Sequence, residues 1–582
     1  MRFHALASDY DGTIAHHGKV DAATIESLKR LLATGRRLIL VTGRELPELL
    51  GILPEIELFE WVVAENGALL YKPSTREERP LADPPPEAFL QALEARKVGP
   101  ISRGRVIVAT WEPHETAVIE TIRDQALDLQ VIFNKGAVMI LPSGINKATG
   151  LKAALKEMKL SPHNVVGVGD AENDHALLRS CELSAAVANA LPAVKETADF
   201  VTTSDHGAGV SQLIEAIIED DLQRCNSALV RHHLPLGTSN EGDVALSPYG
   251  RNLLICGPSA SGKSTVATRI VESLADLKYQ FCLIDPEGDY SGLDIGGTTH
   301  FGGPHAAFSE EEVLRRLEDP EGNVVVSLTG MPIPDRPPAF LSLLAKVLQL
   351  RVRSGRPHWL ILDEAHHLLP ADWQPPDGML PEDLWNVLFV TVHPDMLSPM
   401  ILKRVSTVLA VGESPANSLR DFARLLEDQR SPPEARRPAE EGEFLLWRRD
   451  SEDPPIAVRG LPCRTERRRH HRKYAEGELP PERSFYFKGP EGRMNLRAQN
   501  LMLFLQMGDG VDDETWDFHL RQGDYARWFR ECIKDANLEA QAEGIANLPD
   551  LTPKETRQLV RKAVEQNYTL PAAGPLPVPD AG

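Results

Sequence analysis

Short apolar runs separated by longer mixed segments follow one another from the N-terminus to about Gly209. The runs predict strands at Ala5–Ser8, Leu38–Val41, Trp61–Ala64, Val165–Val168 and Ala185–Val187. The intervening segments include predicted helices at Asp21–Thr34 and Lys147–Lys159. Strands that alternate with helices in this way predict a mostly parallel sheet with helices on both faces.

The stretch from about Tyr71 to Pro142 interrupts this alternation. It has predicted helices and strands of its own, namely Pro86–Glu94, Thr116–Leu127, Val106–Trp111, Val131–Asn134 and Ala137–Leu141. We therefore expect an α+β cap, at about 71–142, inserted into a first domain of residues 1–215.

A second alternating α/β pattern occupies about residues 235–449. A predicted helix, Ile214–Ser227, leads towards it, and a hairpin within Pro235–Arg251 precedes it. Its strands are expected at Asn252–Cys256, Phe281–Ile284, Val324–Leu328, His358–Leu362, Val387–Thr391 and Thr407–Val411. The pattern predicts a second domain built around a parallel sheet.

The C-terminal part has a different composition. Residues 450–483 are rich in Pro, Glu and Arg and are expected to form a linker, and 484–566 form a small, mainly helical domain after one strand, Phe485–Phe487. The last segment, 567–582, contains four prolines and is predicted to be a disordered tail.

The bulk composition is that of an ordinary globular protein. The 582 residues exceed what one core holds and predict roughly three to five domains. No apolar run reaches about 18 residues and no signal peptide is evident, so neither a membrane span nor secretion is expected. Six scattered cysteines without metal-binding spacing favour reduced thiols in a cytoplasmic protein. The net charge of −21 disfavours non-specific adhesion to nucleic acid or anionic membranes.

Carboxylates follow two of the first domain's predicted strands. Asp9 follows Ala5–Ser8, at the strand end where α/β sheets place their ligands, and Asp170 follows Val165–Val168. A carboxylate at Asp9 can attack phosphorus when a cation neutralises the phosphate oxygens, and Asp170 supplies the second carboxylate that Mg²⁺ needs. Asp11 can protonate the leaving alcohol and then activate water.

Two further residues complete a phosphate site. Thr42, also at a strand end, can donate a hydrogen bond to phosphate, and Lys147 adds a compact positive charge. The pattern predicts a phosphomonoester hydrolase that forms an aspartyl phosphate.

These residues lie in four segments that resemble the motifs of haloacid dehalogenase superfamily phosphatases: Asp9-Tyr10-Asp11-Gly12-Thr13, Val41-Thr42-Gly43-Arg44, Asn146-Lys147 and Gly169-Asp170-Ala171-Glu172-Asn173-Asp174. Their order and spacing, with Leu141–Gly150, resemble the Cof-type, class IIB branch over residues 1 to about 215, and that branch includes many sugar phosphatases. The resemblance implies a Rossmann-like core in which Asp9 is the nucleophile and Asp11 the general acid/base. It also implies that Asp9, Asp170 and the Asp11 carbonyl bind Mg²⁺, that Asn173 contacts phosphate, and that Asp174 has a supporting role.

The second α/β domain contains a phosphate-binding loop. Residues Gly257 to Ser264 fit GxxxxGK[ST] between a predicted strand and the helix Thr265–Leu274. Backbone amides of such a loop, between Gly257 and Gly262, wrap the phosphates of ATP, while Lys263 reaches the β and γ oxygens and Ser264 binds Mg²⁺. Thr265 is included among the ATP-binding residues.

Four apolar residues precede Asp363-Glu364 about a hundred residues later. Asp363 is predicted to hold the Mg²⁺ shell, and Glu364 to polarise the attacking water. The two segments together predict an ATPase.

Three segments of the second domain resemble HerA/FtsK-type motor ATPases, which have a RecA-like fold: Phe281–Tyr290, Asp363–His367 and Thr391–Pro394. The resemblance implies a sensor role for Thr391, a hexameric ring that translocates nucleic acid or protein, and an arginine donated by a neighbouring subunit, with Arg404 and Arg420 as candidates. The chain departs from HerA because a phosphatase and a hairpin stand in place of a β-barrel, which puts ring formation in question. His366 and His367 are interpreted as part of this family sequence, with metal binding as the alternative.

Two features remain outside these sites. A basic run from Arg464 to Lys473 is interpreted as a solvated linker, with phosphate binding as the alternative. The aromatic residues between Phe485 and Phe529 are interpreted as the core of the small helical domain, with base stacking as the alternative.

The preferred hypothesis is a bifunctional enzyme in which a Mg²⁺-dependent phosphatase for a small phosphorylated substrate is joined to an ATPase. One alternative is a nucleic-acid motor, as a homo-oligomer, with an accessory phosphatase. A second alternative is a phosphatase regulated by a nucleotide-sensing switch. The sequence leaves the substrate and the oligomeric state open.

Overall fold

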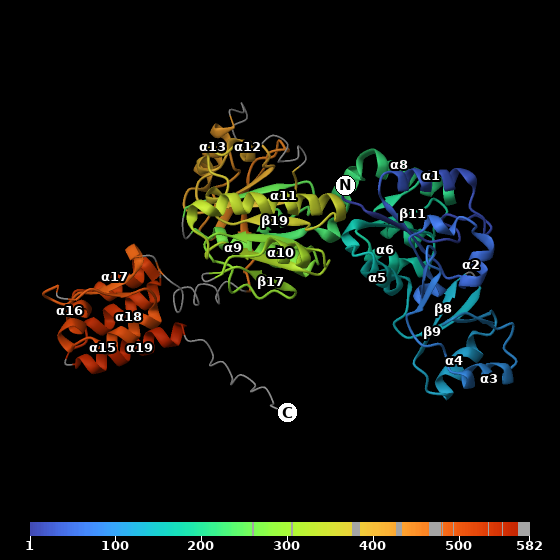
Figure 1. The fold of residues 1–582 in the computed structure, drawn as a ribbon, viewed down its shortest axis with the longest axis horizontal. Coiled ribbons are helices and arrows are strands. Elements are labelled where there is room, and N and C mark those ends of the chain that lie inside the picture. The colour runs from blue at the N-terminus through green and yellow to red at the C-terminus, as the bar shows by residue number, and fades with distance from the viewer. Residues whose placement is uncertain are drawn as a thin grey trace. The chain divides into compact units, whose positions relative to one another are not determined.

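The computed structural model describes residues 1–134, 136–258, 261–303, 306–374, 384–426, 434–464, 479, 481–492, 494–533, 535–549 and 551–568 (Figure 1). The chain forms two compact units. The first contains Met1–Glu287 and Ile295–Leu461, and the second contains Gly288–Asp294 and Pro462–Gly582. Within the described residues, no helix combines the length and the apolar character needed to span a membrane.

The first unit begins with an eight-stranded sheet in the order β12-β11-β10-β1-β2-β3-β4-β5. The strands are β1 Ala5–Ser8, β2 Arg37–Val41, β3 Trp61–Ala64, β4 Leu69–Lys72, β5 Glu77–Pro80, β10 Val165–Gly169, β11 Leu183–Ala186 and β12 Phe200–Val201. The strands from β12 to β3 are parallel, which confirms the predicted sheet.

Helices cover both faces of this sheet, as the apolar strands require. On one face α1 (Ala22–Ala33) and α8 (His206–Asp220) pack together, and their apolar side chains enclose one core with the sheet. On the other face α5 (Lys147–Glu157) and α6 (His175–Ser180) enclose a second core. Two shorter helices, α2 (Leu46–Ile52) and α7 (Pro192–Thr197), also belong to this domain.

Two sequence predictions need correction here. The strand β5 lies inside the range expected for the cap, 71–142, but it pairs antiparallel with β4 and extends the main sheet. The helix expected at Ile214–Ser227 begins earlier, at His206, and ends at Asp220 because Asp221 and Leu222 adopt left-handed backbone angles.

The cap is a separate four-stranded antiparallel sheet in the order β6-β7-β9-β8. It consists of β6 Ser102–Arg103, β7 Val108–Trp111, β8 Leu129–Asn134 and β9 Ala137–Pro142, with α3 Glu87–Ala95 and α4 Glu115–Asp124. Phe89, Leu93 and Val118 of the helices pack with apolar residues of the sheet, so the cap has a core of its own.

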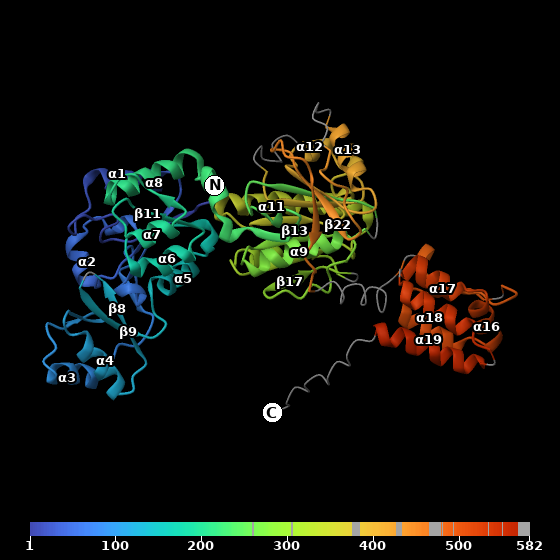
Figure 2. The same cartoon turned by 180° about the vertical axis from the view of Figure 1, so that it is seen from behind.

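The rest of the first unit is built on an eleven-stranded sheet in the order β14-β13-β23-β22-β21-β15-β20-β19-β16-β18-β17. The strands are β13 Leu234–Ser239, β14 Gly242–Leu246, β15 Asn252–Cys256, β16 Phe281–Asp285, β17 Thr298–Phe301, β18 Asn323–Ser327, β19 Trp359–Leu362, β20 Val387–Thr391, β21 Thr407–Ala410, β22 Glu443–Arg448 and β23 Ile456–Gly460. The helices are α9 Lys263–Asp276, α10 Glu310–Leu317, α11 Arg336–Ser354, α12 Pro399–Leu402 and α13 Pro415–Leu425. Figure 2 shows α9 beside β13, with which it packs.

The linker expected at 450–483 is wrong at its start, because β23 pairs with β22 and β13 inside the sheet. Ala457 and Val458 of β23 are buried, and Ala457 packs in the core of the sheet, although the surrounding sequence is rich in Pro and Arg. Residues 465–478 lie outside the described part, as does most of the basic run from Arg464 to Lys473.

Among its described residues, the second unit contains a short hairpin and five α-helices. Their bounds are β24 Phe485–Phe487, β25 Leu496–Ala498, α15 Leu501–Gly510, α16 Asp513–Arg521, α17 Asp524–Trp528, α18 Ala536–Ala546 and α19 Pro553–Tyr568. Phe485, Phe487, Trp516, Tyr525, Trp528 and Phe529 are buried in one core. The aromatic residues therefore pack the domain, as the sequence predicted. The tail from 569 onward is outside the described residues.

Candidate functional site

Three residues predicted for the phosphate site directly follow the parallel strands β1, β2 and β10. They are Asp9, Thr42 and Asp170. The register pairs Ser8 with Leu40 on one side and with Val168 on the other, so the residues after these strands share one edge. There, the Thr13 hydroxyl lies 3.2 Å from Asp9 Oδ2 and 3.2 Å from Asp170 Oδ1. Parallel pairing thus joins residues far apart in the sequence at one point.

Lys147 is the central cation of this site. It begins α5, whose start is fixed by a capping box at Asn146, and only 2% of its surface is exposed. Its Nζ donates to Asp9 Oδ1 at 2.6 Å and to Asp174 Oδ1 at 2.5 Å. Burial opposes its charge, but Asp174 and Asp9 together raise the pKa of Lys147 above its usual value.

The carboxylates of Asp9, Asp170 and Asp174 gather an oxygen each within 4.8 Å of one another. Burial, with the nearby charge of Asp174, raises the pKa of Asp9 to about 7, although Lys147 acts in the opposite direction. A cluster of carboxylates with one lysine still carries excess negative charge, and oxygen is the donor that Mg²⁺ prefers. These residues therefore fit a divalent cation, and Asp174 lies beside the predicted ligands with its own oxygens bonded to Lys147 and to the Asp170 and Ala171 N–H groups.

Asp11 lies at the same edge, but its carboxylate is paired with Arg44. Arg44 Nε donates to Asp11 Oδ2 and Nη2 donates to Asp11 Oδ1, both at 2.6 Å. Sequence reasoning did not assign a role to Arg44. The signal was present, since Arg44 follows directly on the segment that contains Thr42.

The other predicted phosphatase residues line the same edge. Thr42 is buried, and its hydroxyl accepts a hydrogen bond from the Arg44 backbone N–H at 3.2 Å. Asn173 Nδ2 donates to Asn66 Oδ1 at 3.3 Å. The residues predicted for the first site thus follow β1, β2 and β10 or begin α5.

The second predicted site begins where β15 ends. Gly257 approaches the Val411 carbonyl so closely that a Cβ would lie 2.3 Å from that oxygen, and Gly262 caps α9 with a left-handed backbone. Lys263 is the first residue of the helix, with Ser264 and Thr265 after it, and Lys263 Nζ donates to the Pro258 carbonyl at 3.0 Å. Residues 259 and 260 of the loop are not described.

Asp363 and Glu364 follow β19, with β20 between that strand and β15. Thr391 ends β20, and its hydroxyl lies 3.2 Å from His366 Nδ1. Burial lowers the pKa of Lys263, while the charges of Glu364 and Asp363 oppose that shift. The structure thus brings the predicted lysine, its two acidic partners and Thr391 to one end of the sheet.

The two candidate arginines lie on either side of β21 in the sequence, one after α12 and the other within α13. Arg404 follows α12, and its Nη1 donates to the Met400 carbonyl at 3.2 Å. Arg420 is exposed on α13. Either arginine was predicted to act at the ATP site of a neighbouring subunit, and this role stays a prediction.

A buried junction, which sequence reasoning missed, joins the two sheets of the first unit. Glu182 is fully buried and accepts hydrogen bonds from Arg2 Nη2 at 2.6 Å and from the Tyr279 hydroxyl at 3.0 Å, and it contacts His163 Nδ1 at 2.5 Å. His163 Nε2 lies 2.7 Å from the Leu277 carbonyl, just after α9.

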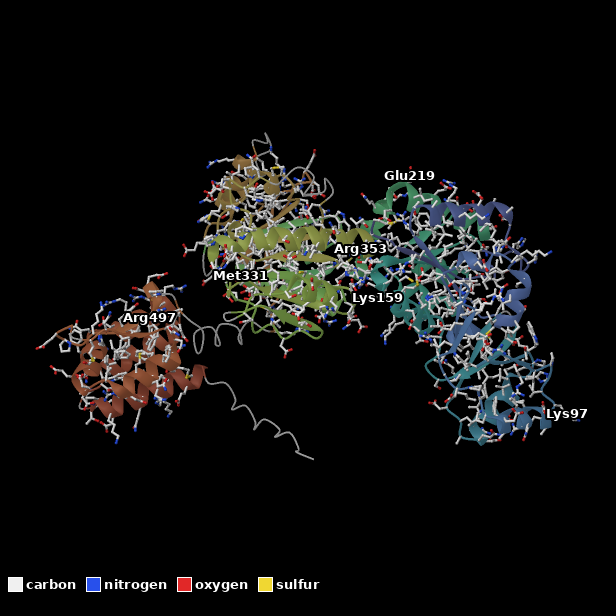
Figure 3. The ribbon with its side chains drawn as sticks, viewed as in Figure 1. Lys97, Lys159, Glu219, Met331, Arg353 and Arg497 are labelled. Atoms are coloured by element: carbon white, nitrogen blue, oxygen red, sulfur yellow. The ribbon has the colours of Figure 1, made fainter. Side chains whose placement is uncertain are left out.

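A second contact across this junction involves Lys159, labelled in Figure 3, whose carbonyl accepts from Arg356 Nη2 at 2.7 Å. The first domain therefore contacts the second domain at Leu277 after α9 and at Arg356 after α11. The junction lies at the strand end away from Asp9, because Glu182 precedes β11 whereas Asp9 follows β1.

Comparison with known proteins agrees with the geometry of the first site. A model of haloacid dehalogenase-like hydrolases matches residues 6–103 and 104–214. Phosphoglycolate phosphatase of Methanosarcina acetivorans is 30% identical over 226 residues, which cover 37% of this chain and 96% of that protein. Phosphoglycolate phosphatase 2 of Saccharolobus solfataricus is 28% identical over 219 residues, which cover 37% of this chain and 91% of that protein.

Among solved structures, a haloacid dehalogenase-like hydrolase from Bacteroides thetaiotaomicron aligns with a TM-score of 0.34 and 19% identity, over 37% of this chain and 99% of that one. The residues that the family model matches include Asp9, Asp11, Lys147 and Asp170. Through this N-terminal part, the chain belongs to the haloacid dehalogenase-like hydrolases.

Proposed function

We propose that the first site hydrolyses a small phosphomonoester through an aspartyl phosphate. The observation that carries the proposal is the arrangement around Asp9, whose carboxylate is buried against Lys147 and lies beside Asp170. A Mg²⁺ ion held by Asp9, Asp170 and the Asp11 carbonyl, near Asp174, would neutralise the phosphate oxygens.

In the first step an Asp9 carboxylate oxygen attacks phosphorus, and the bond from phosphorus to the leaving oxygen breaks. Asp11 donates the proton that the leaving alcohol needs. In the second step Asp11 takes a proton from water, and the resulting hydroxide attacks phosphorus and releases phosphate and Asp9. Lys147 stabilises the charge that develops on the phosphate oxygens, and Thr42 is placed to donate a hydrogen bond to them.

The names of the relatives support a proposal for the substrate class. Proteins that match the whole N-terminal part are named phosphoglycolate phosphatases, and Cof-type sequences include sugar phosphatases. We propose a small substrate in which a phosphate is joined to a polar carbon group, either a hydroxy acid or a sugar.

The test is phosphate release in the presence of Mg²⁺ from 2-phosphoglycolate and a panel of sugar phosphates. The Asp9→Asn variant should lose at least a thousandfold of the activity on the best substrate, because the amide is a poor nucleophile. Activity that survives this change would refute the assignment of Asp9.

A second proposed activity is binding and hydrolysis of ATP with Mg²⁺ at the end of β15. Support comes from the position of Lys263 at the start of α9 and from its electrostatic interaction with Asp363 and Glu364. Lys263 and the backbone amides of the loop would bind the phosphates, Ser264 and Asp363 would hold the metal, and Glu364 would orient water.

The Lys263→Ala variant should lose ATP turnover, while Lys346→Ala, which removes an exposed lysine on α11, serves as the matched control. Normal ATP hydrolysis by Lys263→Ala would refute the proposed site. The same assay with double-stranded DNA separates the alternatives. Stimulation by DNA together with a ring-shaped homo-oligomer favours a motor, whereas a phosphatase rate that changes with bound ATP favours a nucleotide-sensing switch.

A further inference from the structure

The turn between β3 and β4 has an unusual backbone. Glu65, Asn66 and Gly67 all have positive φ angles, of 53°, 55° and 105°. Only glycine adopts this region readily, so two side-chain-bearing residues in succession are held there by their surroundings. Strained backbone of this kind indicates that the surrounding structure holds this turn in one position.

The backbone of the turn contacts the loops that form the phosphatase site. The Glu65 N–H donates to the Arg44 carbonyl at 3.0 Å, and the Asn66 N–H donates to the Thr42 carbonyl at 2.9 Å. Gly67 packs so tightly on the start of α5 that a Cβ would lie 1.9 Å from the Asn146 carbonyl oxygen. The turn therefore has a fixed position relative to Thr42, Arg44 and Lys147.

The Glu65 side chain points the other way, into the cap. Its surface is 0% exposed, and its carboxylate accepts three backbone hydrogen bonds from the loop between β6 and β7. Oε1 accepts from the Arg105 N–H at 2.7 Å, and Oε2 accepts from Val106 and Ile107 at 2.8 and 3.0 Å. A Cβ on Gly104 would lie 2.6 Å from the carboxylate, so the loop closes around this group.

The loop in turn positions the cap's inner surface. Val106 and Ile107 pack with Ala68, Leu141 and Met139 in one cluster. A Cβ at Gly43, beside Thr42, would contact the Met139 methyl group at 3.5 Å. The cap therefore contacts the loop of Thr42 and Gly43 through Met139, which packs with the Val106 and Ile107 that Glu65 holds.

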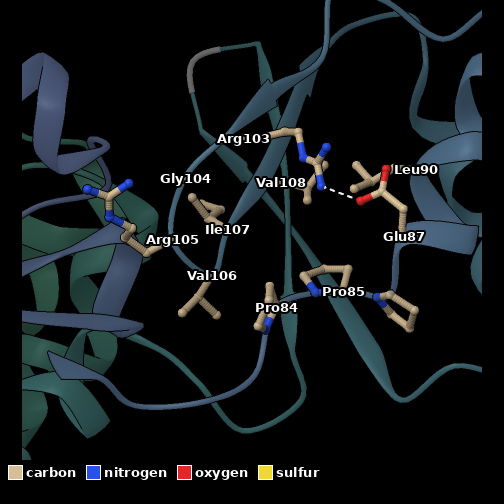
Figure 4. Close-up of a pocket in the computed structure, with 11 residues that line it drawn as sticks. Pro84, Pro85, Glu87, Leu90, Arg103, Gly104, Arg105, Val106, Ile107 and Val108 are labelled. Carbon is tan, nitrogen blue, oxygen red and sulfur yellow. Dashed lines mark hydrogen bonds and ion pairs between the residues drawn. The ribbon is translucent and has the colours of Figure 1, made fainter.

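Figure 4 shows the same loop from its cap side. Arg103 turns to Glu87, with which it forms an ion pair at 2.6 Å, and Arg105 is directed away from that pair. A hollow of about 400 Å³ adjoins the loop on this side and is lined in part by Pro84 and Leu90. The Arg105 side chain pairs with Glu78 of β5 in the main sheet at 2.6 Å, while the backbone amides of Arg105, Val106 and Ile107 donate to Glu65.

We propose that Glu65 is a positioning residue that fixes the cap over the phosphatase site and so sets the preference among substrates. This inference rests on the proposed phosphatase function. A carboxylate that accepts three N–H groups from a loop is a strong, directional link in a buried setting. Substrates whose carbon group contacts the cap depend on this link. Substrates with an activated leaving group, such as p-nitrophenyl phosphate, depend on it less.

The test uses Glu65→Gln in the full chain. The amide keeps the shape of the side chain but presents an NH₂ group to backbone N–H donors, so at least one of the three hydrogen bonds is lost. We expect kcat/KM for the best small substrate of the panel to fall at least tenfold, mainly through KM, and that for p-nitrophenyl phosphate to fall less than threefold. Glu78→Gln is the matched control. Glu78 is exposed on β5 and pairs at 2.6 Å with the side chain, not the backbone, of Arg105 in the same loop.

A second measurement is independent of activity. Hydrogen exchange at the amides of residues 105–107 should accelerate at least tenfold in Glu65→Gln relative to the wild type and to Glu78→Gln. The Gly104→Ala variant, which leaves the carboxylate in place but crowds it, should reproduce the loss of substrate preference. Equal loss on all substrates, or unchanged exchange at these amides, would overturn the inference. Absence of Asp9-dependent hydrolysis in the wild type would instead overturn the proposed function.

Discussion

The Arg44 guanidinium holds the Asp11 carboxylate in a two-bond ion pair, with both N–H···O distances at 2.6 Å. This arrangement fixes the orientation of Asp11 at the edge of the sheet and raises the pKa of Arg44. Paired carboxylate and guanidinium groups match in geometry, so the contact is directional as well as charged.

Replacement of Arg44 by alanine should lower the phosphatase kcat. Without its partner, Asp11 loses the orientation that proton transfer requires, and a loss of about tenfold to a hundredfold is expected. Steady-state kinetics at saturating Mg²⁺ measures it. Glu48→Gln removes the other carboxylate that contacts Arg44 and should leave kcat within about twofold; equal effects of both variants would contradict the role of the Asp11 pair.

Asp174→Asn should raise the Mg²⁺ concentration needed for half-maximal phosphatase activity by about tenfold to a hundredfold. Asp174 Oδ2 accepts the backbone N–H groups of Asp170 and Ala171, both at 3.0 Å, while its Oδ1 pairs with Lys147. An amide cannot accept all three hydrogen bonds, so the Asp170 loop loses its orientation. Titration of activity with Mg²⁺ after treatment with EDTA provides the measurement. Glu172→Gln, an exposed neighbour, should keep the wild-type metal dependence.

Glu182→Gln should destabilise the first unit. The fully buried Glu182 carboxylate pairs with Arg2 and contacts His163. The substitution would leave the buried charge of Arg2 without this partner. Removal of one member of a buried ion pair costs about 3–5 kcal/mol. Chemical denaturation followed by circular dichroism should show this loss in the free energy of unfolding. The exposed pair of Glu219 and Arg224 provides the control, and Glu219→Gln should change the free energy of unfolding by less than about 0.5 kcal/mol. Equal losses of stability in Glu182→Gln and Glu219→Gln would contradict the role assigned to the buried junction.

Acidification from pH 7.5 to 5 should lower the melting temperature. Burial lowers the pKa of His232 to about 4 from 6.5, although Glu182 acts in the opposite direction. The unfolded chain therefore binds a proton as the pH falls through 6.5, whereas the folded protein binds it only near pH 4. The stability contributed by neutral His232 is full above pH 6.5 and declines between 6.5 and 4, by about 1.4 kcal/mol for each unit of the shift.

Differential scanning calorimetry at several pH values measures this slope. His232→Gln should reduce it, because glutamine does not titrate. Part of the slope should persist, since burial also lowers the pKa of His4 and of His366 to about 4, while Asp9, whose pKa burial raises to about 7, acts in the opposite direction. A wild-type melting temperature that is constant over this range would contradict the prediction.

Local sequence patterns determined most of the secondary structure. The strands Ala5–Ser8, Trp61–Ala64, Asn252–Cys256 and Val387–Thr391 have the predicted bounds. Short runs of buried apolar residues between turns specify such strands without reference to distant parts of the chain. The same local information placed Asp9 and Asp170 directly after strands, which was sufficient to predict that parallel pairing brings them together.

Tertiary structure alone decided the remaining features. The strand β5 joins the main sheet through pairing with β4, and its exposed residues gave no apolar signal for that choice. Arg44 and Asp11, Glu65 and Val106, and Glu182 and Tyr279 meet because sheet register and packing bring separate segments together. A periodic pattern records which face of an element is buried, but it carries no information about the partner that covers that face. The sequence therefore determined the elements and the chemistry at their ends, and the packed structure decided which side chains position that chemistry.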